Sequence, residues 1–64
     1  MQLDLNKVNI AIANSGLTKT EIAKKAGYSR QRLMMVLNQR ELTPLAVGKV
    51  ARALGVDSKD IVED

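Results

Sequence analysis

Residues 17–33 read LTKTEIAKKAGYSRQRL, and this stretch decides the fold. The Thr18 hydroxyl can cap a helix, and Glu21, three residues later, can close a capping box. Gly27 suits the left-handed backbone conformation in which helices commonly end. Ser29 then offers a cap for a second helix. The stretch therefore predicts two short helices joined by a tight turn.

Both predicted helices carry apolar residues at helical spacing. They extend from Thr18 to Ala26 and from about Arg30 to Leu37. The residues that we expect to face the core are Ile22, Ala23, Ala26, Leu33, Val36 and Leu37. Because so few residues separate the two helices, they must cross steeply. We therefore predict a helix-turn-helix over about residues 18–37.

The rest of the chain predicts three more helices, so that five short helices form one all-α domain over residues 1–64. Asp4 can cap a first helix that runs to about Asn14, and Gly16 can end it. Its inward-facing residues are expected to be Leu5, Val8, Ala11 and Ile12. The sequence shows no strand pattern, internal repeat or linker.

A fourth helix is expected to begin at Thr43 and Pro44, because proline at the first helical position leaves no amide unsatisfied. Gly55 can end this helix. Its buried residues are expected to be Val47, Val50, Ala51 and Leu54. Gly48 lowers helix stability by about 1 kcal/mol relative to alanine, and we attribute it to the close approach of a neighbouring helix. Asp57 can cap a last short helix.

The composition argues against several classes of function. The chain has no Cys and no His, so that a metal site would rest on carboxylates alone. The longest apolar run, Leu33 to Leu37, is too short to cross a bilayer, and the first residues lack the features of a signal peptide. There is no glycine-rich phosphate loop and no evident carboxylate pair. We therefore expect a cytoplasmic protein that is not an enzyme and binds no cofactor or metal.

Positive charge is concentrated in the middle of the chain. The net charge is +3, and six of the ten Lys and Arg residues lie between Lys19 and Arg40, where Glu21 is the only acid. The rest of the chain carries four cations and six acids. This clustering favours a nucleic acid as partner. Helix surfaces of small proteins are also rich in Lys and Arg, so charge alone does not decide the function.

Three segments carry a family resemblance. Leu17 to Arg30 follows the pattern Leu-Thr-x-x-Glu-Ile-Ala-x-x-Ala-Gly-x-Ser-Arg, Asn38 to Arg40 forms the connection, and Ala51 to Val56 reads Ala-Arg-Ala-Leu-Gly-Val. Together they make the chain similar to Cro/CI-type (XRE-like) helix-turn-helix transcriptional regulators. The resemblance implies a lambda-repressor-like fold and a recognition helix in the major groove. It also implies a homodimer on a palindromic DNA operator.

The chain departs from this family pattern at three points. Family members often have Gln at the position of Lys19, where Lys retains a phosphate contact through charge alone. Many have Gly at the position of Gln39, which leaves the conformation of the following loop open. Many also carry a sensor or oligomerisation domain, and we expect no small-molecule ligand within this chain.

The predicted helix from Arg30 places two base-reading side chains in its first turn. Arg30 can pair with guanine and Gln31 with adenine. Arg and Gln also occur at exposed helix starts for helix propensity alone. Met35, about one turn further along, can touch a thymine methyl group, and Met34 is the weaker candidate. Both Met residues could instead fill gaps in the core.

The resemblance places a set of phosphate-binding residues around this helix. They are Thr18, Lys19, Arg32, Asn38 and Arg40. Lys24 and Lys25 are expected to face solvent and to add only a diffuse positive field. Tyr28 is the only aromatic residue, so base stacking is not expected, and we expect it to pack against Leu33 rather than to contact a phosphate.

The end of the chain offers a candidate dimer interface. Val56, Ile61 and Val62 lie there with few apolar partners left in the sequence, and the resemblance places dimer contacts in the same region. Val56 and Ile61 could instead be used within the domain, which makes Val62 the main candidate. The alternative function is a protein-interaction adaptor, an antirepressor or an antitoxin built on the same fold.

Overall fold

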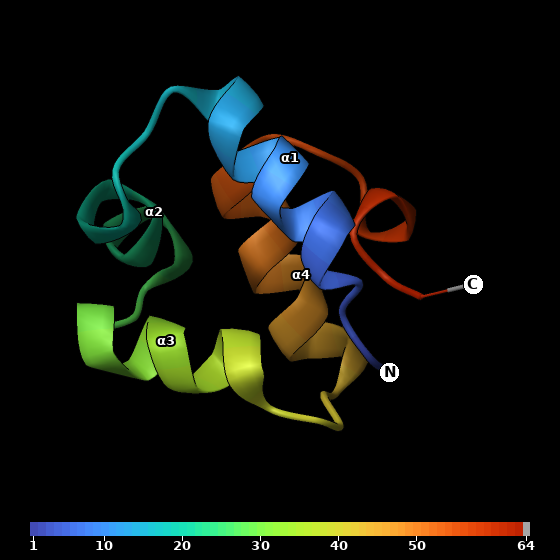
Figure 1. Ribbon diagram of the computed structural model, residues 1–64. Coiled ribbons are helices and arrows are strands. Elements are labelled where there is room, and N and C mark those ends of the chain that lie inside the picture. The colour runs from blue at the N-terminus through green and yellow to red at the C-terminus, as the bar shows by residue number, and fades with distance from the viewer. Residues whose placement is uncertain (64) are drawn as a thin grey trace.

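The computed structural model describes residues 1–63 and contains four α-helices followed by one turn of 3₁₀-helix (Figure 1). The elements are α1 Leu5–Ser15, α2 Lys19–Ala26, α3 Arg30–Asn38, α4 Pro44–Leu54 and η1 Ser58–Asp60. The four α-helices agree with those predicted from the sequence. The prediction of a fifth helix is wrong in its type. Asp57 and Asp60 cap each other across a single turn, and Ile61 then enters the core, so η1 does not continue.

The helix-turn-helix is specified by local contacts at its helix ends. The Thr18 hydroxyl oxygen accepts a hydrogen bond from the Glu21 amide at 3.2 Å, and a Glu21 carboxylate oxygen accepts one from the Thr18 amide at 2.9 Å. Gly27 follows α2 with φ of 80°, where a side chain would be strained. The Ser29 hydroxyl oxygen then accepts from the Arg32 amide at 3.1 Å and starts α3. These caps confirm the predicted boundaries of both helices.

Helix α4 lies at the centre of the fold and packs against α1, α2 and η1 (Figure 1). Its Val47 and Val50 side chains are completely buried. Leu33 of α3 and Ile61 after η1 are equally buried, and these residues belong to one hydrophobic cluster. The main packing partner of α3 is α2. Helix α3 is therefore held from one side and lies along one edge of the molecule.

Two sequence predictions about packing are wrong. Leu5, predicted to face inward, is 52% exposed. Val8 and Ala11 occupy the core side of α1, and Leu5 lines open clefts between α1 and α3 instead. Gly48 has no close neighbour, because a Cβ atom built on it would meet no atom within 4 Å. Packing therefore does not explain why glycine occupies this position in α4.

The two ends of the chain pair with each other. Leu3 and Val62 form an isolated antiparallel bridge, and the Asp4 amide donates to the Ile61 carbonyl at 2.8 Å. Figure 1 shows both ends on the same side of the molecule, away from α2. Within residues 1–63 there is no β-strand, and no helix is long and apolar enough to cross a membrane. The pairing of the ends holds Ile61 in place against the core.

Candidate nucleic-acid interface

Helix α3 presents one face to the core and the other to solvent. Leu33, Val36 and Leu37 are buried, as predicted. In the first turn, Arg30 and Gln31 are both exposed. Met35 is 58% exposed on the same helix, which excludes the alternative that it fills the core. The outer face of α3 thus carries polar and flexible side chains on a backbone that is fixed by packing from behind.

Met34 differs from Met35 in its surroundings. It is partly buried and lines a cleft of about 210 Å³ together with Lys19 of α2 and Asn38 at the end of α3. Leu5 lines this cleft from the α1 side. Met34 therefore covers apolar surface between helices, and we keep it out of the base-reading set.

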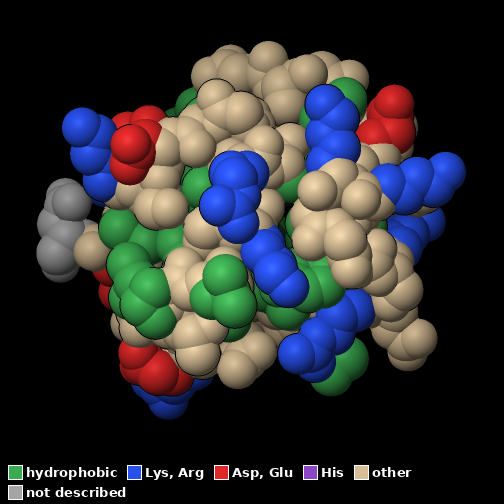
Figure 2. Space-filling view, turned by 180° about the vertical axis from the view of Figure 1, so that it is seen from behind, with side chains coloured by type: hydrophobic (Ala, Val, Ile, Leu, Met, Phe, Trp, Pro, Cys, Tyr) green, Lys and Arg blue, Asp and Glu red, His purple; other side chains and the backbone are tan. Residues whose placement is uncertain are grey.

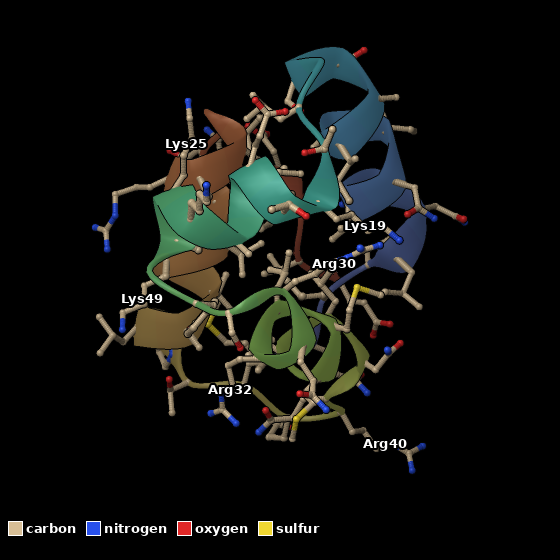
Figure 3. All side chains as sticks on the ribbon, turned by 90° about the vertical axis from the view of Figure 1, so that its left-hand side faces the viewer. Lys19, Lys25, Arg30, Arg32, Arg40 and Lys49 are labelled. Carbon is tan, nitrogen blue, oxygen red and sulfur yellow. The ribbon has the colours of Figure 1, made fainter. Side chains whose placement is uncertain are left out.

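The predicted phosphate-binding residues lie around α3 on several elements. Figure 3 shows Lys19 and Arg40 on one side of α3 and Arg32 below it. These three side chains are exposed, and none has an ion-pair partner within the described part of the chain. Cations on α2, on α3 and in the loop after α3 therefore flank α3.

The two uncharged members of the predicted phosphate set already make local hydrogen bonds. The Thr18 hydroxyl oxygen accepts from the Glu21 amide at 3.2 Å, and a hydrogen bond from the same side chain helps to lower the pKa of the Glu21 carboxyl. The Asn38 side-chain amide donates to the Met34 carbonyl at 2.9 Å, which uses one of its two N–H groups. Both residues are exposed, and the second N–H of the Asn38 side-chain amide has no partner within residues 1–63.

The loop after α3 is fixed without glycine. Gln39 has φ of −72° and ψ of 131°, an extended conformation that any residue adopts. Its side-chain amide donates to the Glu41 carbonyl at 3.0 Å. The amino group of Met1 bonds to the carboxylate of Glu41 and to the Leu42 carbonyl. The departure from the family pattern at Gln39 is therefore compatible with an ordered loop that carries Arg40.

A wider cleft of about 560 Å³ separates the start of α1 from the end of α3. Asp4 and Glu63 line it on one side, and Arg40 lines it on the other. The cleft is open to solvent, and its lining carries charges of both signs. It therefore does not favour a ligand of one charge. Within residues 1–63, no three potential metal-binding side chains cluster.

Glu21 is the only acid between Lys19 and Arg40, and its carboxylate caps the start of α2. The hydrogen bonds from the Thr18 backbone and side chain, with smaller contributions from Lys25 and Lys24, lower the pKa of the Glu21 carboxyl. The carboxylate is therefore ionised at neutral pH and tied to the cap of α2. It does not neutralise the cations on α3 or in the following loop.

Lys49 of α4 is a residue near α3 that the sequence did not single out. Its ammonium nitrogen lies 5.6 Å from the centre of the Tyr28 ring. Tyr28 is partly buried against the hydrophobic cluster, as expected for a packing role. Because 21 positions separate these two residues in the sequence, no local pattern could have indicated their contact.

The residues of the candidate dimer interface differ in exposure. Ile61 is completely buried in the core of its own protomer, so it offers no surface to a partner. Val56 and Val62 are partly buried. Of the three residues, Val56 and Val62 remain available for contact with a second copy.

The comparisons with known proteins agree with this geometry. A helix-turn-helix family model matches residues 11–61, which include α2, α3 and α4 with their caps. Searches of curated proteins and of solved structures found no match. The family match confirms the resemblance that the sequence motif indicated. The chain therefore belongs to the Cro/CI-type (XRE-like) helix-turn-helix family of DNA-binding regulators.

Proposed function

We propose that this protein is a sequence-specific regulator that represses transcription by inserting α3 into the major groove of an operator. The observation that carries the proposal is the two-faced character of α3. Leu33 and Val36 anchor the helix, whereas Arg30, Gln31 and Met35 are exposed on it. An α-helix fits the major groove, where each base pair presents a distinct pattern of donors and acceptors.

The surrounding residues then divide into two roles. Arg30 and Gln31 read guanine and adenine edges, and Met35 packs against a thymine methyl group. The phosphate-binding residues are Thr18, Lys19, Arg32, Asn38 and Arg40. Contacts to phosphates position α3 on the duplex without specifying its sequence. The positive charge around α3 supports this division, because Glu21 is tied to the cap of α2.

We further propose that two protomers bind one palindromic operator. A dimer reads two half-sites about one helical turn, roughly 34 Å, apart and so gains specificity over a single domain. Val62 is partly buried beside the paired chain ends, and Val56 follows the end of α4. These two side chains form the proposed contact across the two-fold axis. The buried Ile61 supports that contact from within each protomer.

Selection of bound sequences from a random pool of duplex DNA tests the main proposal. We expect one enriched palindromic sequence, bound with a log–log salt slope of about −0.9 for each phosphate that is neutralised. A scrambled duplex of the same length is the control. Binding that ignores salt, or equal binding to selected and scrambled duplex, contradicts the proposal and favours a protein-interaction role.

Sedimentation of the protein with the selected palindrome tests the dimer. We expect two protomers per duplex in the wild type and weaker two-to-one binding in Val62→Asp. Ile10→Asp provides a control, because Ile10 is an apolar surface residue on α1 and is 61% exposed. Thermal melting of both variants checks that the fold is retained. One protomer per palindrome at saturation, or unchanged two-to-one affinity in Val62→Asp, excludes the interface.

A further inference from the structure

Lys49 of α4 lies over an aromatic ring. The residue is only partly exposed, and its ammonium nitrogen lies 5.6 Å from the centre of the Tyr28 ring. None of the carboxylates described in residues 1–63 forms an ion pair with it. The aromatic ring attracts the cation without neutralising its charge. The ammonium group is thus oriented by Tyr28 and still able to bind an anion.

The Tyr28 ring places this cation beside the start of α3. Tyr28 immediately precedes Ser29, which caps α3, and its own amide donates to the Ala23 carbonyl at 2.8 Å. The backbone of Tyr28 is therefore fixed by the end of α2. Lys49 belongs to the central helix α4, so both partners are held by rigid elements.

Figure 3 shows Lys49 on the side of α3 opposite to Lys19 and Arg40. A helix of about 10–12 Å diameter nearly fills a major groove about 12 Å wide, so the two DNA backbones pass along its two sides. With α3 in the groove, Lys19 and Arg40 would lie toward one of these backbones and Lys49 toward the other. Figure 2 shows that Lys and Arg side chains also extend over the middle of the molecule's other face, whereas Asp and Glu lie toward its edges.

We propose that Lys49 binds a phosphate of the second DNA backbone, with the Tyr28 ring as the platform that positions its ammonium group. This inference rests on the proposed DNA-binding function and adds a contact from outside the helix-turn-helix. The partial burial of Lys49 and the Tyr28 ring restrict the side chain before DNA arrives. Binding therefore costs less side-chain entropy than it does for a freely moving surface lysine.

The salt dependence of binding to the selected palindrome tests this contact. Lys49→Met retains the apolar stem and removes the charge, whereas Lys49→Arg retains the charge. For a two-to-one complex, we expect Lys49→Met to reduce the magnitude of the salt slope by about 1.8, or about 0.9 per protomer, and Lys49→Arg to preserve it. Lys59→Met is the matched control, because Lys59 is exposed on η1 and should leave the slope unchanged.

Two substitutions of Tyr28 test the role of the ring. Tyr28→Phe keeps the aromatic face and should bind as the wild type does, whereas Tyr28→Leu should weaken binding. Combined with Lys49→Met, Tyr28→Leu should add little further loss, because the two residues act on one phosphate. If Tyr28 and Lys49 have a purely structural role, Tyr28→Leu and Lys49→Met should lower the melting temperature and leave the salt slope unchanged. That result overturns the proposal. If the wild type itself does not bind the selected palindrome, the proposed function is overturned instead.

Discussion

Helices α3 and α4 begin with the same kind of cap but differ in how they are packed and exposed. The Ser29 hydroxyl oxygen caps α3 at 3.1 Å, and the Thr43 hydroxyl oxygen caps α4 by accepting from the Ala46 amide at 3.2 Å. Helix α4 packs against three elements, whereas α3 packs mainly against α2. The exposed side of α3 carries Arg30 and Gln31 in its first turn.

This difference separates the residues that hold the fold from those that bind. Helix α4 is the central scaffold, so its buried side chains are expected to determine stability. Helix α3 is an edge helix, so its exposed side chains are expected to determine affinity and specificity. Substitutions on the two helices should therefore affect different measurements.

The largest expected effect concerns stability and lies on α4. Leu54→Ala should lower the free energy of unfolding by about 2–5 kcal/mol, because Leu54 is buried in the core and leaves a cavity. Leu45→Ala is the same substitution on the same helix, but Leu45 is 65% exposed and should change stability by less than about 0.5 kcal/mol. Urea unfolding measures both. Equal losses of unfolding free energy in the two variants would show that burial does not determine the stabilising effect of these two leucines.

The next largest effect concerns DNA binding and lies on α3. Arg30→Ala and Gln31→Ala should each cost about 1–3 kcal/mol on the selected duplex and much less on scrambled duplex. Arg40→Ala should weaken both duplexes, since a phosphate contact carries no sequence information. All three side chains are exposed, so unfolding should be nearly unchanged. If Arg30→Ala weakened both duplexes equally, its base-reading role would be wrong.

The comparison of α3 and α4 also shows what the sequence could predict. The starts of both helices, at Ser29 and Thr43, were predicted, because a cap is formed by residues three positions apart. The exposure of Arg30 follows from the same helical periodicity that buries Leu33. Which DNA sequence the exposed residues read does not follow from periodicity, because it depends on a partner molecule.

The errors arose where a position depends on how elements pack in space. Leu5 has an apolar spacing that predicts burial, but the separation of α1 from α3 leaves it at the rim of a cleft. The contact between Tyr28 and Lys49 likewise depends on the packing of α2 against α4. The sequence allows Ile61 either in the core or at an interface, and the pairing of the chain ends places it in the core.

A smaller effect is expected at Gly48, the position on α4 where the predicted close approach is wrong. Gly48→Ala should raise the free energy of unfolding by about 0.5–1 kcal/mol, because alanine has the higher helix propensity and a Cβ atom meets nothing within 4 Å. Urea unfolding measures the gain, and DNA affinity should stay unchanged. A loss of stability would indicate that a neighbour approaches α4 more closely in solution.

The smallest expected effect is on the pH dependence of stability. It distinguishes the start of α2 from the start of α4. The Thr18 backbone amide donates to the Glu21 carboxylate, and this bond lowers the carboxyl pKa below its ordinary value of 4.5. The folded state therefore gains stability from the ionised group above the unfolded pKa. That gain is lost as the pH falls through the lowered folded pKa. The corresponding position of α4 is Ala46, which has no carboxylate.

Thermal unfolding between pH 7 and pH 3 measures this difference between the two helix starts. Glu21→Gln can keep the capping hydrogen bond but carries no titrating charge. The stability advantage of the wild type over Glu21→Gln should therefore be present at neutral pH and disappear at the acid end. Thr43→Ala should lower stability by about 1 kcal/mol at every pH, because its cap involves a hydroxyl only. A wild-type advantage over Glu21→Gln that persists unchanged at pH 3 would show that the carboxylate charge does not stabilise the start of α2.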